Sequence, residues 1–220
     1  MSPAISIIIP TQNEADHLPA TLSSLPSESL KPEVIVVDAN SSDETLTIAR
    51  EAGCHLITSP AASRAKQQNL GAAHANAPVL LFLHADTRLP PTALDQITAA
   101  LKTPANIVGG AFARYFDSPS LILKLTCKLA LFRSRYFHLF LGDQAIFVRR
   151  HIFHQINGFD ESLSQCEDLD FSLRLRQIGP TTVLSPPVRS SDRRFRNQGP
   201  LKTTLKDFTT ACSFLKKRKE

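Results

Sequence analysis

The sequence lacks several features that would each indicate a particular class of protein. Its four cysteines, Cys54, Cys127, Cys166 and Cys212, lie far apart and form no C-x-x-C motif. We therefore expect unpaired thiols in a reducing compartment, and neither a disulfide framework nor a zinc site. No charge-free apolar run approaches the length of a transmembrane helix, and residues 1–5 lack the basic segment of a signal peptide. These absences predict a cytoplasmic protein.

Glycine is missing from the loop after the first predicted strand. Residues 5–10 form a predicted buried strand that Pro10 is expected to end, and the polar residues 11–14 (TQNE) follow it. A Rossmann fingerprint and a P-loop both need glycines at this point. The sequence therefore argues against both of these nucleotide-binding motifs.

The composition is that of a globular protein with one domain. The chain has 220 residues, of which 42% are hydrophobic and 20% charged, and this is enough for one sizeable core. Its net charge of +5 would suit anionic ligands such as nucleotide phosphates, or an acidic membrane surface. For the bulk charge we favour a solvated basic face, and we expect no nucleic-acid partner.

Short apolar runs alternate with helical patterns in the first half of the chain, and polar residues follow the runs. This alternation predicts an α/β fold with a parallel sheet and helices on both faces. The predicted strands are residues 5–10, 33–38, 54–58 and 79–84, and the predicted helices are residues 16–25, 41–52, 64–74 and 91–101. A capping box at residues 41–44 is expected to open the second helix.

The second half has a different pattern, without internal repeats or a linker. Strands are predicted at residues 109–116, 144–148 and 182–184. A long helix or helix pair is predicted at 119–141, further helices at 167–177 and 201–219, and an arginine-rich loop at 190–199.

His84 and Asp86 follow the most apolar predicted strand. Residues two apart on an extended chain point the same way, and open α/β sheets bind ligands at the carboxyl ends of their strands. A carboxylate beside an imidazole suits a divalent cation that carries phosphate oxygens. The alternative is an ordinary polar turn, because Asp and Thr are common turn residues.

Five short motifs, in order and with suitable spacing, resemble the family 2 glycosyltransferases, which have the GT-A nucleotide-sugar fold. The motifs are IIIPTQNE (7–14), VVDANSSDET (36–45), RAKQQNLGA (64–72), HADT (84–87, at the place of the family's D-x-D) and ED (167–168). The resemblance covers about residues 5–200. The runs LHADT (83–87) and GDQAIFVRR (142–150) are similar to a bacterial subgroup often called radical-SAM- or selenodomain-associated transferases.

The resemblance implies an inverting enzyme that moves a sugar from a nucleoside diphosphate sugar, of the UDP type, to a hydroxyl acceptor with Mn²⁺ or Mg²⁺. It implies a nucleotide-binding half at about residues 1–100, an acceptor and catalytic half at about 101–200, and a C-terminal helix with a basic tail at 201–220. The nucleotide-binding residues would be Pro10, Thr11, Glu14, Asp38, Arg64, Ala85 and Asp86.

The same resemblance implies individual roles. Asp86 would bind the metal, whereas His84 replaces the family's first Asp and could touch ribose, bind the metal or only hold Asp86. Asp38 would read the nucleobase edge, or else serve as a structural carboxylate. Asp168, with Glu167 beside it, matches the catalytic base. Arg193 and Arg194 could clamp the diphosphate, although the family's Trp is absent here.

Three other interpretations remain open. A non-catalytic sugar-nucleotide-binding protein would bind the donor without turnover, and a nucleotidyltransferase would normally show a glycine-rich loop. The helix in residues 121–141 carries Lys124, Lys128 and Arg135 beside an apolar stripe, and residues 216–219 are basic. These features indicate either peripheral contact with the inner face of a membrane or an ordinary surface helix. No feature predicts the donor sugar, the acceptor or the oligomeric state.

Overall fold

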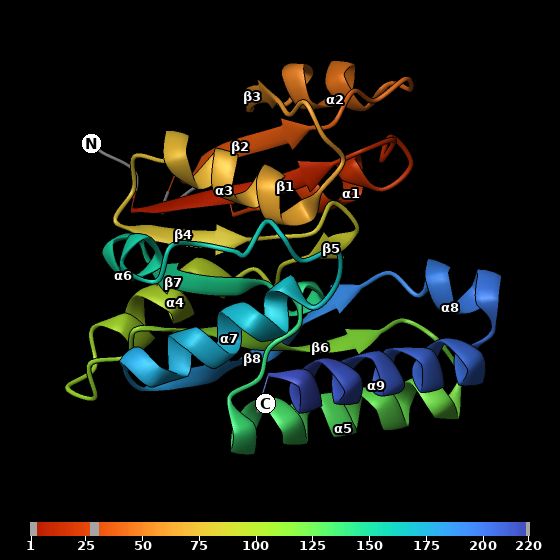
Figure 1. The fold of residues 1–220 in the computed structure, drawn as a ribbon. Helices are drawn as coiled ribbons and strands as arrows, with labels where there is room; N and C mark the ends of the chain where they lie inside the picture. Colours follow the sequence, from red (N-terminus) through yellow and green to blue (C-terminus); the bar gives the residue numbers. More distant parts are fainter. Residues whose placement is uncertain (1–3, 27–30, 219–220) are drawn as a thin grey trace.

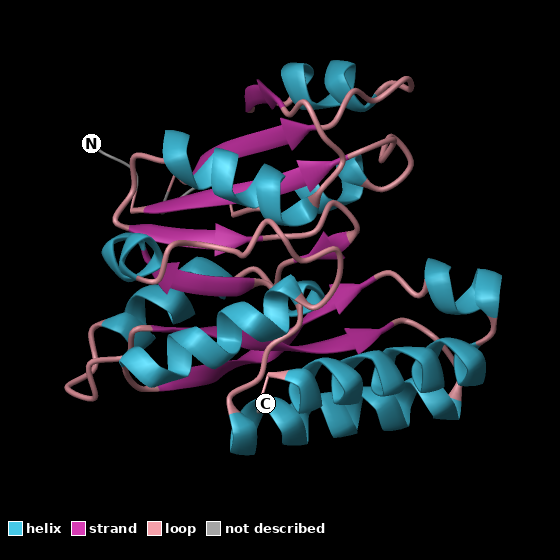
Figure 2. Cartoon of the chain, viewed as in Figure 1, coloured by secondary structure: helices cyan, strands magenta, loops and turns pink. Residues whose placement is uncertain are grey.

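The structure, a computed structural model, describes residues 4–26 and 31–218. Residues 1–3, which the signal-peptide prediction includes, and Lys219, the predicted end of the last helix, lie outside these ranges. The described chain forms an eight-stranded sheet of order β3-β2-β1-β4-β7-β6-β8-β5 with helices on both faces (Figures 1 and 2). This is the predicted α/β architecture.

The first half of the chain builds the parallel part of the sheet, as predicted. Strand β1 pairs in parallel with β2 on one side and with β4 on the other, and β3 adds to β2. The elements are β1 (Ile5–Thr11), α1 (Leu18–Leu22), β2 (Glu33–Asp38), α2 (Thr45–Glu51), β3 (His55–Thr58), α3 (Arg64–His74), β4 (Val79–Phe82) and α4 (Ala93–Leu101).

Strand β1 does not end at Pro10, contrary to the prediction. The carbonyl of Ile8 accepts a hydrogen bond from Leu83 on the β4 side, and the carbonyl of Thr11 accepts one from Ala39 on the β2 side. Pro10, two residues after Ile8, therefore turns its nitrogen towards β4, which has already ended at Phe82. The missing N–H costs no ladder bond there, so the strand continues to Thr11.

The second half adds a mixed part of the sheet, in which β7 runs antiparallel to both β4 and β6, and β8 pairs with β6 in parallel. Its elements are β5 (Thr87–Arg88), β6 (Gly109–Phe116), α5 (Leu121–Phe137), the 3₁₀ helix η1 (Gly142–Gln144), β7 (Ile146–Arg149), α6 (Arg150–Gln155), α7 (Glu167–Ile178), β8 (Thr181–Ser190), α8 (Arg193–Gln198) and α9 (Pro200–Lys217). The predicted loop at 190–199 thus contains a helix.

The predicted capping box at residues 41–44 is wrong. Helix α2 begins only at Thr45, and Glu44 makes no side-chain cap. Instead, the Asp43 carboxylate accepts hydrogen bonds from the backbone N–H groups of Thr45 and Ala15, both at 3.1 Å. The Asp43 carboxylate therefore ties the start of α2 to the loop after β1, because it binds a backbone N–H group of each.

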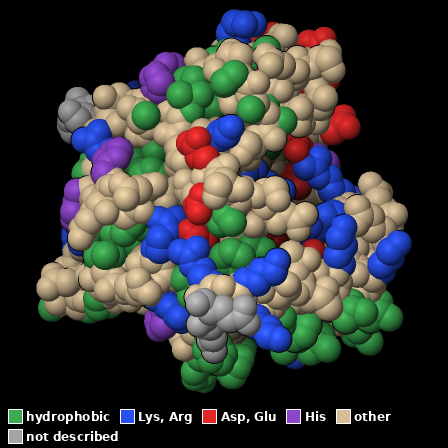
Figure 3. Space-filling view, viewed as in Figure 1, with side chains coloured by type: hydrophobic (Ala, Val, Ile, Leu, Met, Phe, Trp, Pro, Cys, Tyr) green, Lys and Arg blue, Asp and Glu red, His purple; other side chains and the backbone are tan. Residues whose placement is uncertain are grey.

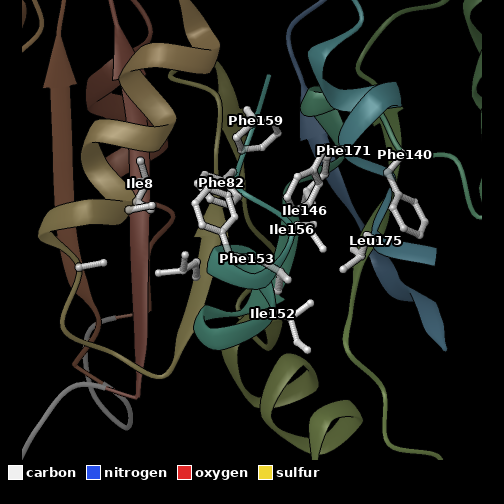
Figure 4. Packing of buried hydrophobic residues seen from close by; sticks show 14 of the residues in the cluster. Ile8, Phe82, Phe140, Ile146, Ile152, Phe153, Ile156, Phe159, Phe171 and Leu175 are labelled. Carbon is white, nitrogen blue, oxygen red and sulfur yellow. The ribbon is translucent and has the colours of Figure 1, made fainter. Parts of the chain in front are cut away.

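Both faces of the sheet are buried, which explains the unbroken apolar runs of the sequence. Alternate residues of β4 enter two separate cores: Phe82 packs under α3 and α7, and Leu81 packs under α4. In the first core the ring of Phe159 stacks on Phe171 of α7 at 4.5 Å and meets the edge of Phe82 at 4.9 Å (Figure 4). These aromatic contacts fix α7 against the centre of the sheet.

Two further predictions concern cysteines and membrane spans. All four cysteines are unpaired, as predicted. Within the described ranges, no helix combines the length and the apolar character needed to cross a bilayer.

Candidate functional site

The candidate site lies where the parallel strands end. Thr11 is the last residue of β1, Asp38 is the last residue of β2, and Asp86 follows β4 by four residues. The chain leaves β1 towards β2 and β3 on one side and returns to β4 on the other. The carboxyl edge beside β1 is therefore a topological switch point, which is the usual place for a ligand in such sheets.

The Asp38 carboxylate is almost fully buried and already has several hydrogen-bond partners. Its Oδ1 accepts from Thr11 Oγ1 at 2.9 Å and from Ser41 Oγ at 2.5 Å, and its Oδ2 accepts from the Ser41 backbone N–H at 2.8 Å. Asp38 thus joins the ends of β1 and β2. These contacts favour the structural carboxylate, and its predicted contact with a nucleobase stays a prediction.

Gln67 is a positioning residue to which the sequence had assigned no role. It is buried in α3, and its amide Nε2 donates to the carbonyls of Thr11 at 2.9 Å and Val37 at 2.8 Å. Both carbonyls belong to the strand ends at the candidate site. The feature of the sequence that could have revealed this role is the position of Gln67 in the third motif. It is a polar side chain on the face of α3 that packs on the sheet.

Arg193 closes one side of the site through carboxylates from two loops. Its guanidinium makes a bidentate contact with Glu14, with Nη1–Oε2 at 2.8 Å and Nη2–Oε1 at 2.5 Å, and its Nε lies 3.2 Å from Asp86 Oδ2. The Glu14 carboxylate raises the pKa of Arg193 above its ordinary value. Arg194 points elsewhere and pairs with Asp207 of α9. The structure therefore places Arg193, but not Arg194, beside the predicted nucleotide residues.

His84, two residues before Asp86, is packed against Gly142. A Cβ atom at Gly142 would come within 2.5 Å of His84 Nε2, so any other residue there would require the His84 ring to move. This Nε2 is buried and finds no hydrogen-bond partner among residues 4–26 and 31–218. Burial, and then the positive charges of Arg64, Arg193 and Arg114, lower the pKa of His84 to about 3. The imidazole is therefore neutral at physiological pH.

Asp168, in the first turn of α7, is held by backbone N–H groups. Its Oδ2 accepts from Gly142 and its Oδ1 from Leu169, both at 2.7 Å. The residue before the acidic pair, Cys166, has φ of 64°. The backbone of a residue other than glycine is strained in this left-handed region, and such strain is common at functional sites.

The segment that carries Gly142 is fixed by two polar side chains, the buried Gln144 and the partly buried Asp143. Gln144 donates to the carbonyl of Phe112 at 3.0 Å and accepts from Arg133 at 2.8 Å. Asp143 pairs with Arg114 of β6, whose side chain is buried and whose pKa falls to about 10 because of that burial. The sequence predicted Gln144 in a strand, but it lies in η1, where these contacts place the Gly142 N–H against Asp168.

Glu167 is buried beside Asp168 and contacts the first half of the chain. Its Oε1 lies 3.5 Å from Nη1 of Arg64, the first residue of α3. Burial, and then the negative charge of Asp168, raise the pKa of Glu167 above its ordinary value. A carboxylate with a raised pKa is a stronger base, so Glu167 is suited to accept a proton.

We expect Glu167→Gln to stabilise the protein at neutral pH. The raised pKa means that folding disfavours the ionised carboxylate. The protonated Glu167 therefore favours folding most at a pH below its pKa in the unfolded chain, about 4.3. This favourable contribution to the free energy of unfolding is lost as the pH rises through the pKa of Glu167 in the folded protein. The substitution also removes the ion pair with Arg64, but the Arg64 side chain is mostly exposed and such a pair is worth little.

Urea unfolding of both proteins between pH 4 and pH 8 checks this expectation. The advantage of the variant should grow as the pH rises and should vanish at the acidic end. A difference that does not change with pH would show that Glu167 is not destabilised by its charge.

The predicted metal site requires donor atoms near Asp86 that suit a divalent cation. In the described part of the chain, no three His, Cys, Asp or Glu side chains are grouped closely enough to hold a metal ion unaided. Asp86 supplies one carboxylate and His84 one buried ring nitrogen without a partner. Mg²⁺ and similar cations often use one or two carboxylates and take their other ligands from substrate phosphates. The residues thus fit a cation that arrives with a diphosphate.

A cavity of about 400 Å³ opens beside Asp86. This volume is within the ordinary range for small-molecule sites. The wall of the cavity is polar and includes His17, Arg88, Asp117, Arg189 and Arg196. Thr11, Asp38 and Arg64 do not line it. Pro10 and Ala85, two other predicted nucleotide residues, are buried, and the Ala85 carbonyl accepts from Thr21 of α1 at 2.7 Å.

Comparison with known proteins places the chain among glycosyltransferases. A family model described as "Glycosyl transferase family 2" matches residues 6–160. The chain is 31% identical over 192 residues to a PGL/p-HBAD biosynthesis glycosyltransferase of Mycobacterium tuberculosis, with 79% of this chain and 70% of that protein covered. It is 29% identical over 107 residues to an uncharacterized glycosyltransferase of the same species and spans about half (48%) of that protein's length.

Solved structures share the fold. The mannosyltransferase PcManGT from Pyrobaculum calidifontis, in complex with GDP-Man and Mn²⁺, has a TM-score of 0.66 and 20% identity, over 87% of this chain and 57% of that one. Glucosyl-3-phosphoglycerate synthase from Mycobacterium tuberculosis, in complex with Mn²⁺, UDP and glucosyl-3-phosphoglycerate, has a TM-score of 0.58 and 16% identity, over 86% of this chain and 70% of that one. The predicted GT-A-like fold is thereby confirmed.

Proposed function

This chain belongs to glycosyl transferase family 2, and from this membership we propose that it is an inverting glycosyltransferase. It would move a sugar from a nucleoside diphosphate sugar, of the UDP type, to a hydroxyl acceptor. The observation that carries the proposal is the contact across the site: His84, two residues before Asp86, packs against Gly142, whose N–H binds Asp168. The segment that carries the predicted metal ligand and the residue proposed as the base are thus both in contact with Gly142.

Asp168 is our candidate for the general base. It would take the proton from the acceptor hydroxyl while the acceptor oxygen attacks the anomeric carbon of the donor. The bond from that carbon to the diphosphate oxygen breaks in the same displacement, and the electron pair leaves with the nucleoside diphosphate. No second nucleophile is required, so the anomeric carbon is inverted. Glu167 stands next to Asp168 and is the alternative base.

Asp86 would hold a divalent cation, Mn²⁺ or Mg²⁺, together with the donor phosphates. The chemistry that such an ion supplies is neutralisation of the negative charge on the leaving diphosphate. Arg193 would assist through its planar guanidinium, which matches phosphate geometry. Since Arg193 now contacts Glu14 and Asp86, donor binding would exchange these carboxylates for phosphate oxygens.

Two finer assignments accompany this proposal. The division into a nucleotide half (about 1–100), an acceptor half (about 101–200) and a C-terminal element (201–220) agrees with the change from parallel to mixed sheet after β4. Membership in the bacterial radical-SAM- or selenodomain-associated subgroup is supported by the contact between His84 and Gly142. Each of these residues lies in one of the two runs that resemble that subgroup.

Thermal unfolding with nucleotide sugars, followed by a turnover assay, tests the proposal. A donor at about 100 times its dissociation constant adds about 2.7 kcal/mol of stability, which for a protein of this size raises Tm by roughly 5–10 °C. We expect this rise with a UDP-sugar in the presence of Mn²⁺, and slow release of UDP from the same donor. Stabilisation by no UDP- or GDP-sugar would contradict the proposal, and binding without any turnover would favour a non-catalytic binding protein.

A further inference from the structure

Helices α5 and α9 lie side by side at the end of the molecule away from β3 (Figures 1 and 2). Both helices expose large apolar side chains. Six of these side chains define the α5–α9 apolar patch: Leu125, Leu129 and Phe132 of α5, and Leu201, Leu205 and Phe208 of α9. Each of the six residues is at least 53% exposed. Hydrophobic side chains accordingly gather along the lower margin of the space-filling view (Figure 3).

The patch is not the face by which these helices pack on the protein. In α5 the buried residues are Leu123, Ala130 and Ser134, whereas Leu125, Leu129 and Phe132 recur at the spacing of a different face. In α9 the buried residue is Thr203. An amphipathic helix usually turns its apolar stripe towards its own core. Here the stripe faces outwards, so core packing does not explain it.

Basic side chains flank the patch, and acidic ones are nearly absent. Lys124, Lys128 and Arg135 are exposed on one face of α5, and α5 contains no Asp or Glu. Helix α9 carries Lys202, Lys206, Lys216 and Lys217, and its single acidic residue, Asp207, is paired with Arg194. The surface thus combines apolar side chains with a positive border.

We propose that the α5–α9 apolar patch docks on an anionic lipid bilayer. Exposed Leu and Phe side chains can enter the interface between headgroups and acyl chains, while lysines at the border are attracted by anionic headgroups. A second copy of the chain is a poorer occupant. In a two-fold symmetric dimer the patch would meet itself, and its basic borders would approach each other without acidic partners. This docking is independent of the proposed reaction, because none of the patch residues belongs to the candidate site.

Co-sedimentation with vesicles tests the docking. The wild-type chain should pellet with vesicles of phosphatidylcholine and phosphatidylserine at low salt, and less at moderate salt because the charges are screened. It should stay in the supernatant with phosphatidylcholine alone. The variant Leu129→Ser/Phe132→Ser/Leu205→Ser should lose the binding, whereas Ile178→Ser, an exposed apolar residue at the end of α7, should not.

A second pair of variants examines the basic border. Lys124→Gln/Lys128→Gln should weaken binding roughly 25-fold, about five-fold for each charge near the surface, while the matched control Lys66→Gln/Lys102→Gln, also exposed, should bind as the wild type does. Circular dichroism confirms that each variant is folded. No pelleting of the wild type with anionic vesicles at low salt would overturn the proposal. Sedimentation velocity that shows a dimer dissociated by the triple substitution would also overturn it, because the patch would then be a self-interface.

Discussion

Replacing Asp168 by asparagine is expected to lower the rate of sugar transfer by about 10²–10⁴-fold, the usual effect of removing a general base. Donor binding should persist, because the Asp168 contacts are with the backbone of Gly142 and Leu169. Asparagine keeps the shape of the side chain but has one acceptor oxygen. It can therefore satisfy only one of those two N–H groups, at a cost of about 1 kcal/mol of stability.

Single-turnover rates and calorimetric donor affinities separate these effects. Glu167→Gln is the matched control, since it removes the neighbouring carboxylate of the same helical turn. We expect a much smaller loss of rate in Glu167→Gln than in Asp168→Asn. The reverse order would identify Glu167, with its raised pKa, as the base. Near-normal turnover in both variants would place the base outside α7.

The parallel half of the fold could be predicted because its signals are local. The residues of β1, for example, are all buried, and all except Ser6 and Thr11 are apolar, which is what a central parallel strand requires. The ends of such elements were harder to place. Pro10 ends a strand only if its nitrogen faces a paired neighbour, and the direction of that nitrogen depends on where β4 stops.

The ends of strand β8 were even harder to predict, for the same reason. The sequence predicted a strand only at residues 182–184, and Pro186 and Pro187, which cannot donate a ladder hydrogen bond, follow it closely. In the structure β8 runs from Thr181 to Ser190, and the prolines fall in an irregular stretch where its pairing with β6 shifts register. A bulge accommodates residues that cannot join the ladder. Its position depends on the partner strand and is not encoded in the local pattern.

The candidate site, like the fold, could be predicted from the sequence only in part. The polar residues after β1, β2 and β4 could be placed at one edge from strand order alone. By contrast, the contact of Arg193 with Glu14 joins residues 179 positions apart, and the support of Asp168 by the Gly142 N–H depends on η1. The loop that contains Arg193 was polar and rich in arginine, so its helix had no apolar periodicity to reveal it.

Replacing Asp86 by alanine is expected to abolish metal-dependent nucleotide binding and to leave the fold intact. Its side chain is the carboxylate that follows β4 at the switch point, where a cation carrying phosphates is proposed. Removing it leaves Arg193 still paired with Glu14, so no buried charge loses its only partner. The backbone carbonyl of Asp86, which accepts from Ser191 at 3.1 Å, is unchanged.

Titration calorimetry with UDP, in the presence and absence of Mn²⁺, measures the effect, and Asp117→Ala provides the control. Asp117 lines the same cavity and also pairs with an arginine, Arg189, but it lies away from the end of β4. We expect the Mn²⁺-dependent affinity to disappear in Asp86→Ala and to persist in Asp117→Ala, with unchanged unfolding transitions in both. If Asp86→Ala binds UDP and Mn²⁺ as the wild type does, Asp86 is not the metal ligand. Loss in both variants would instead mean that the negative charge of the cavity, rather than coordination by Asp86, attracts the cation.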